Sequence, residues 1–165
     1  MLEDKTVAAA REIVELATNR GVTCGCAESC TGGLVAAAIT AIPGSSVPFR
    51  GGVVSYASDV KHDVLGVDKT VIDDAQLGVV SAPCAEQMSQ GAQRVLSCDV
   101  AVSVTGIAGP GGAEPGKPVG TVWFGLACGQ DVSSERHVFD GSRDEVRSQA
   151  VMHALRLLRE GILKL

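Results

Sequence analysis

The spacing of apolar residues predicts an alternation of helices and strands along the chain. Between residues 4 and 20, apolar side chains recur every three or four positions, as in an amphipathic helix, and Gly21 supplies its end. Shorter apolar runs, bounded by glycine, proline or serine, have the length of strands. In order, we expect a helix over 4–20, a strand over 22–27, a helix over 34–41, a strand over 52–56, a short helix capped by Ser58, an irregular or briefly helical connection over 66–78, a helix capped by Ser81, strands over 99–105, 121–128 and 133–139, and a last helix from 142.

The connections indicate how these elements pack. The short turn 129–131 joins the last two strands, so this pair should be antiparallel. The last helix opens with the capping box Ser142-x-x-Glu145. We therefore expect one α/β domain over residues 1–165, with three α/β/α layers and a mixed sheet of about five strands.

The stretch 27–33, Ala-Glu-Ser-Cys-Thr-Gly-Gly, stands between a predicted strand and a predicted helix. Such a turn exposes backbone N–H groups at a helix N-terminus, where an anion or a developing oxyanion is stabilised. Ser29 and Thr31 are candidate oxygen nucleophiles and Cys30 is a sulfur one, while Gly32 and Gly33 allow a ligand to approach the main chain. A capped helix whose glycines serve tight packing explains the same residues.

Other polar residues should gather at the same edge of the sheet, where the parallel strands end. Tyr56, the single tyrosine, follows the second strand, and Lys61 lies about one helical turn beyond it. Thr105 and Gly106 open a loop to Gly120 that holds six glycines and three prolines, which is typical of a functional segment. Arg143 stands at the start of the last helix, where its charge opposes the helix dipole, so we expect it to serve a ligand.

A hydroxyl nucleophile needs a base, and none of the three histidines is placed as an obvious triad member. A lysine whose pKa is lowered by burial or neighbouring cations can activate serine instead, with a tyrosine between them relaying the proton. Taken singly, Lys61 reads as a solvated helix lysine and Tyr56 as an ordinary strand-end residue. Their shared location favours a site.

Composition narrows the class of protein. Apolar residues make up 45% of the chain and charged residues 20%, and the net charge of −5 argues against a general nucleic-acid binder. No apolar run approaches the ~20 residues of a membrane helix, and the start lacks the layout of a signal peptide, so we expect a cytoplasmic protein. Six cysteines lack the spacing of common zinc sites and read as small buried apolar residues, so we expect no metal.

Motifs spread over nearly the whole chain resemble one known family. The first is Ala27-Glu28-Ser29-Cys30-Thr31-Gly32-Gly33. It is followed by Pro43-Gly44-Ser45-Ser46, Tyr56-x4-Lys61, Leu65-Gly66-Val67, Val80-Ser81, 105–112 (Thr-Gly-Ile-Ala-Gly-Pro-Gly-Gly) and 117–122 (Lys-Pro-Val-Gly-Thr-Val). Together they resemble the C-terminal domain family of the competence/damage-inducible protein CinA, especially its stand-alone PncC-type members. That likeness also implies the three-layer fold of anticodon-binding domains.

The resemblance implies an activity and roles for particular residues. It implies deamidation of nicotinamide mononucleotide to nicotinate mononucleotide and ammonia, in pyridine nucleotide salvage, without cofactor or metal. Ser29 would be the nucleophile, and Tyr56 and Lys61 would supply base and acid. The expected substrate-binding residues are Thr31, Gly32, Gly33, Thr105, Gly106 and Arg143.

Two other functions fit the same residues. One is a nucleotide-binding or regulatory module without turnover, and the other is a cysteine hydrolase using Cys30. For either function and for the amidohydrolase, we expect a small nucleotide ligand, no nucleic-acid or membrane partner, and a homodimer.

Overall fold

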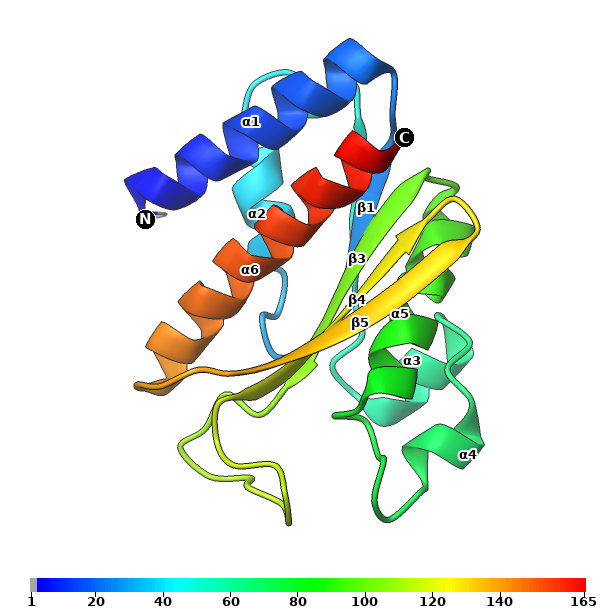
Figure 1. Ribbon diagram of the computed structural model, residues 1–165, viewed down its shortest axis with the longest axis vertical. Helices are drawn as coiled ribbons and strands as arrows, with labels where there is room; N and C mark the ends of the chain where they lie inside the picture. The colour runs from blue at the N-terminus through cyan, green and yellow to red at the C-terminus, as the bar shows by residue number, and fades with distance from the viewer. Residues whose placement is uncertain (1–2) are drawn as a thin grey trace.

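The structure is a computed structural model that describes residues 3–165, and it has three layers around a mixed five-stranded sheet (Figure 1). The strand order is β2-β1-β3-β4-β5. β1 is parallel to both β2 and β3, whereas β4 is antiparallel to β3 and to β5. The strands are β1 Cys24–Glu28, β2 Phe49–Val54, β3 Val100–Gly106, β4 Thr121–Cys128 and β5 Asp131–Val138. The expected α/β/α architecture is confirmed.

Helices cover both faces of the sheet (Figure 1). The larger core lies under α1, α2 and α6, and a smaller one lies under α4 and α5. The helices are α1 Asp4–Arg20, α2 Leu34–Thr40, α3 Ser58–Asp63, α4 Lys69–Ile72, α5 Ala82–Leu96 and α6 Arg143–Lys164. Within the described part of the chain, no helix is long and apolar enough to cross a membrane.

Most of the predicted helix ends are confirmed by their local geometry. Gly21 has φ 66° at the end of α1, a conformation that glycine adopts without strain. The Ser81 hydroxyl accepts from the Cys84 amide at the start of α5. Ser142 and Glu145 form the full capping box of α6.

Several strand and helix boundaries differ from the prediction by one to three residues, and one predicted cap is absent. β2 begins at Phe49 rather than at 52. Phe49 pairs with Cys24 and Gly51 (φ 144°) pairs with Gly25, so a bulge lies between these two pairs and the ladder with β1 continues on both sides of it. Ser58 does not cap α3, because it is the first helical residue. The N-cap position belongs to Ala57, and no side chain makes a capping hydrogen bond there. β5 begins at Asp131, which pairs with Cys128 and leaves only two residues in the turn.

The parallel strands end at one edge of the sheet, which lies at the bottom of Figure 1. The turn after β1, the segment after β2 and the glycine-rich loop after β3 all start there. The beginning of α6 comes to the same region, because Arg143 contacts Gly109 in the loop. This edge is the place where we expected the site.

Candidate active site

Ser29 and Lys61 are in direct contact at this edge. Ser29 follows β1, and its amide donates to the Val104 carbonyl of β3 over 2.9 Å, which fixes the start of the turn. The Lys61 Nζ reaches across from α3 and lies 3.0 Å from the Ser29 Oγ. Nucleophile and base candidates are therefore already within hydrogen-bond distance.

Lys61 is buried, contrary to the ordinary expectation of a solvated helix lysine. It is 1% exposed, and its Nζ also contacts two main-chain carbonyls, Ser55 at 2.6 Å and Tyr56 at 3.3 Å. No carboxylate of residues 3–165 lies within 4.0 Å of it. Burial lowers the pKa of Lys61 below its ordinary value of 10.5, because the ammonium is removed from water without a counter-ion.

Tyr56 does not lie between Ser29 and Lys61 in this structure. Its main-chain carbonyl is the group that faces Lys61, whereas its side chain is turned outward and the residue is 63% exposed. The Tyr56 hydroxyl accepts from the Arg143 Nη2 at 3.3 Å. The tyrosine relay expected from the sequence would therefore require the ring to move.

Glu28, directly before the nucleophile candidate, holds the turn in place. Its side chain is fully buried, and its carboxylate accepts from the amides of Gly33, Val35 and Ala36 at 2.9–3.1 Å. A buried carboxylate thus occupies the start of α2, where it satisfies three orphan donors and complements the helix dipole. The sequence analysis gave Glu28 no role, because the known local signals of a helix start lie at the N-cap and in the first turn, not five residues before them.

This arrangement changes which amides are open to a ligand. The Gly33 amide is bonded to Glu28, and the Gly32 amide donates to the Ser29 carbonyl at 3.1 Å. The amides of Cys30 and Thr31 donate to no other residue among 3–165, although the Cys30 amide also faces its own thiol. The start of α2 is therefore already filled, and the open donors lie one and two residues after Ser29.

Arg147 of α6 also holds the turn. From α6 its guanidinium donates to the carbonyls of Cys30 at 3.1 Å and Thr31 at 3.2 Å. The Cys30 carbonyl shares a planar peptide bond with the Thr31 amide, so holding this carbonyl also fixes the direction of that amide. The hydroxyls of Thr31 and Ser55 are buried and have no partner among the described residues, so both remain available to a ligand or to water.

The remaining expected ligand residues lie nearby with contacts of their own. Arg143 donates from Nη1 to the Gly109 carbonyl at 2.8 Å and so ties the glycine-rich loop to α6. The Thr105 hydroxyl donates to the Val79 carbonyl at 2.7 Å. A Cβ on Gly106 would lie 2.7 Å from the Thr121 carbonyl oxygen, so close strand packing requires glycine there. That Arg143, Thr105 and Gly106 contact the substrate stays a prediction.

The cysteines behave as buried apolar residues, as expected. All six are free thiols and buried. Burial raises the pKa of Cys30 to about 11, so the thiolate needed for nucleophilic attack is disfavoured at neutral pH. The geometry therefore favours Ser29 over Cys30 as nucleophile.

Comparison with known proteins shows the family of the chain. Residues 6–162 match the family described as the CinA C-terminal domain, and the chain belongs to that family. The nicotinamide-nucleotide amidohydrolase PncC of Escherichia coli strain K12 is 41% identical over 165 residues, covering 99% of each protein. The CinA-like protein of Geobacter metallireducens is 44% identical over 151 residues, which are 92% of this chain but only 36% of that protein.

The fold is shared with solved structures of the same family. The crystal structure of the competence/damage inducible protein CihA from Agrobacterium tumefaciens superposes with a TM-score of 0.92 at 38% identity, covering 98% of each chain. The family resemblance and the fold expected from the sequence are thus both confirmed.

Proposed function

We propose that the chain is a serine-type amidohydrolase that deamidates nicotinamide mononucleotide to nicotinate mononucleotide and ammonia. The observation that carries the chemistry is the 3.0 Å contact between the buried Lys61 Nζ and the Ser29 Oγ. The substrate follows from the likeness to the E. coli nicotinamide-nucleotide amidohydrolase over 99% of both chains.

The partners of Lys61 support its role as the base. A neutral amine has two N–H bonds and one lone pair. Two of its three partners, the Ser55 and Tyr56 carbonyls, are acceptors only, so they take the two N–H bonds. The lone pair is left for the Ser29 hydroxyl, which then donates to Nζ. Lys61 removes this proton as the Ser29 oxygen attacks the carboxamide carbon.

The open amides of Cys30 and Thr31 supply the oxyanion site in this proposal. Attack converts the carboxamide oxygen to an oxyanion. These two N–H groups belong to the residues that follow the nucleophile in the chain, and they donate hydrogen bonds to that oxyanion. Each preorganised donor of this kind is typically worth about 3 kcal/mol in the transition state. Gly32, which has no side chain, lets the substrate approach the turn.

Collapse of the tetrahedral intermediate releases ammonia. The Lys61 ammonium returns its proton to the leaving nitrogen as the C–N bond breaks, and an ester to Ser29 remains. Water, deprotonated by the neutral Lys61, then attacks the ester and frees Ser29 with nicotinate mononucleotide. Tyr56 acts as the second member of the acid–base pair if its exposed ring turns from Arg143 toward Ser29 on substrate binding.

The scheme needs no metal or cofactor, and it assigns the phosphate to Arg143. This arginine is exposed and uses only two of its five N–H groups on Gly109 and Tyr56. Arg147 is committed to the turn, so it is less free to bind phosphate. Thr105 and Gly106 are expected to border the nicotinamide end, beside the loop that Arg143 holds.

The alternative is a binding module that keeps the pocket without turnover. The experiment that separates the two functions measures ammonia release and nucleotide affinity on one preparation of purified protein. Multiple turnovers of nicotinamide mononucleotide support the amidohydrolase. Binding of the nucleotide without any ammonia released would establish the module instead.

A further inference from the structure

A second group of reactive side chains lies along the outermost strand β5, with β3 and β4 between it and β1, which carries the Ser29 turn. Glu135 and His137 belong to the edge strand β5, and His153 belongs to α6. One carboxylate oxygen and two imidazole nitrogens from these residues all lie within 4.8 Å of one another. The sequence analysis found no use for either histidine, because only the folded chain brings them together.

The fold explains why these three side chains converge. Glu135 and His137 are two positions apart on a strand and therefore point to the same face. Ser134, directly before Glu135, points to the other face, where its hydroxyl donates to Glu86 of α5. His153 lies against β5 from α6, which covers the first face.

Aromatic packing holds the two imidazoles in position. Their ring centroids are 4.0 Å apart. His137 stacks on Phe139 with an interplanar angle of 11° and meets Phe124 edge-on, and His153 lies 4.5 Å from the Phe124 ring. Ligands whose rotamers are fixed by packing form a preorganised site.

The polar contacts within the group all meet at one atom. The Glu135 Oε1 contacts the Nε2 of His153 closely and the Nε2 of His137 at 3.3 Å. The Arg156 Nη2 lies 2.8 Å from the same oxygen. Three nitrogens thus crowd one carboxylate oxygen, with both imidazoles presenting the same ring nitrogen. A cation between these atoms would turn this crowding into coordination.

We propose that Glu135, His137 and His153 bind a divalent transition-metal ion of the zinc class. Two imidazoles and one carboxylate are a common donor set for such ions, and three protein ligands leave coordination positions for water. The ion would join the edge strand β5 to α6. Strands β3 and β4 separate it from β1, which carries the Ser29 turn, so it takes no part in the proposed amide hydrolysis.

The Arg156 guanidinium competes with the ion for the Glu135 carboxylate, but it also has a second carboxylate partner, Glu160. Its Nη2 also lies 3.1 Å from the His153 Nε2, where a metal would be coordinated. Its Nη1, however, already pairs with Glu160 at 2.5 Å, one turn further along α6. Rotation of the guanidinium toward Glu160 would free the Glu135 oxygen without leaving the arginine unpaired.

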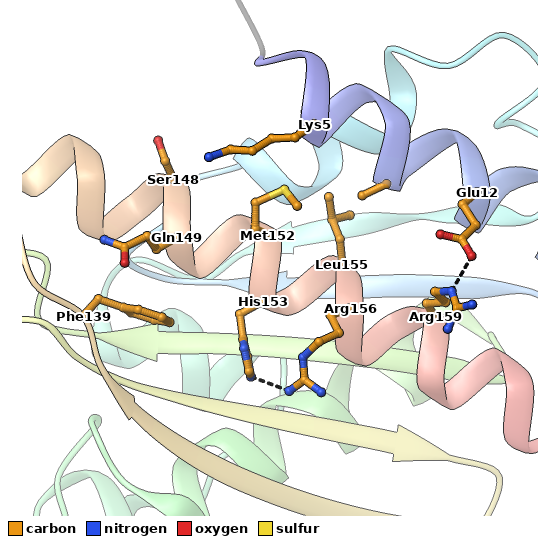
Figure 2. A pocket seen from close by; sticks show the side chains of 11 residues that line it. Lys5, Glu12, Phe139, Ser148, Gln149, Met152, His153, Leu155, Arg156 and Arg159 are labelled. Carbon is orange, nitrogen blue, oxygen red and sulfur yellow. Dashed lines mark hydrogen bonds and ion pairs between the residues drawn. The ribbon is translucent and has the colours of Figure 1, made fainter.

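A cavity reaches His153, one of the three proposed ligands. It has a volume of about 600 Å³ and lies between α1 and α6, beside Phe139 (Figure 2). His153 and Arg156 both line it, and their side chains contact each other (Figure 2). The cavity is lined by neither Ser29 nor Lys61, so it is separate from the candidate active site.

The test is binding of Zn²⁺ and Co²⁺ to chelator-stripped protein, measured by equilibrium dialysis. We expect one ion per chain, and visible Co²⁺ absorption without a thiolate charge-transfer band. His137→Ala and His153→Ala should each weaken binding by at least about tenfold, since even outer-shell partners change metal affinity 10- to 100-fold. Arg156→Ala should bind at least as tightly as wild type. His62→Ala is the matched control, because this third histidine lies on α3.

Several results would overturn the proposal: no bound ion in wild type, unchanged affinity in both histidine variants, or a thiolate band showing that cysteines hold the Co²⁺. Should either variant fail to fold, imidazole ¹⁵N spectra of wild type with and without Zn²⁺ decide whether the two histidines bind the ion. Zn²⁺ must then shift the His137 and His153 signals and leave that of His62 in place. If all three signals stay unchanged, the site does not exist.

Discussion

The Nζ of Lys61 lies 3.0 Å from the Oγ of Ser29, although 32 positions separate the two residues in the chain. The lysine comes from α3, after β2, and the serine follows β1, so the parallel pairing of these strands brings them together. Lys61 is also buried without a carboxylate partner among the described residues. Both features are those of an amine able to take a proton from a serine hydroxyl.

Lys61→Met should lower kcat/KM for ammonia release by about 100- to 10,000-fold, the usual contribution of a positioned acid–base group. Steady-state assays on the purified variant give this number. Lys69→Met, at an exposed lysine of α4, is the matched control and should keep wild-type activity. The substitution removes a buried cation but leaves the Ser55 and Tyr56 carbonyls without a donor, so thermal unfolding is measured alongside to show that Lys61→Met is folded. Wild-type kcat/KM in a folded Lys61→Met would exclude Lys61 as the base.

The pH dependence should report the lowered pKa of Lys61. Activity requires the neutral amine, so kcat/KM should rise with pH and level off above an apparent pKa below 10.5. Between that pKa and 10.5 the unfolded chain holds a proton that the folded chain has lost. The stability of wild type relative to Lys61→Met should therefore rise with pH by up to about 1.4 kcal/mol per unit in this window.

Paired denaturant titrations at several pH values measure that difference. Using the variant as reference cancels the effect of the buried thiols other than Cys30 and Cys84, whose pKa values Lys61 itself lowers. A stability difference that does not change with pH would mean that Lys61 keeps its ordinary pKa.

Glu28→Gln should destabilise the fold by about 2 kcal/mol, because a neutral amide replaces the carboxylate that accepts from three amides of α2. Turnover should fall too, since the Ser29 turn is anchored at this residue. Urea unfolding and ammonia release measure the two effects. Glu15→Gln, at an exposed site on α1, should change neither. Loss of stability with full turnover would show that Glu28 does not position the nucleophile.

Arg143→Ala should raise KM for nicotinamide mononucleotide about 10- to 100-fold, the range expected when a charge-assisted contact to phosphate is lost. The KM for the dephosphorylated nucleoside should change little in Arg143→Ala, because this substrate has no phosphate for the arginine to bind. Comparing the two substrates thus isolates the phosphate contact. An equal loss for both would indicate that Arg143 acts by holding the glycine-rich loop at Gly109 instead.

The sequence predicted the elements well wherever a local signal marks them. Gly21, Ser81 and the Ser142–Glu145 box specify helix ends through short-range geometry, and the structure confirms all three. The start of β2 was missed because the bulge opposite Cys24 depends on pairing with another strand. A pattern read along one strand does not contain that information.

The same distinction holds for the site. Ser29, Tyr56 and Lys61 could be chosen from the sequence, because they follow predicted parallel strands or the helix after them. The burial of Lys61 and the outward turn of Tyr56 depend on contacts between distant segments. Arg147 reaches the Ser29 turn from 116 positions away, and no periodicity links the two. Likewise, the pairing of His137 with His153 needs α6 to cross β5.

The most direct test of the account is ammonia release from nicotinamide mononucleotide by wild type and by Ser29→Ala, with chelator present throughout. We predict turnover by wild type that chelator does not reduce, and a loss of at least about a thousandfold in a folded Ser29→Ala that still binds the nucleotide. Trapping of the labelled nicotinoyl group on Ser29 would identify the ester. Undiminished turnover by Ser29→Ala, or activity that chelator abolishes and metal restores, would contradict a serine-based mechanism.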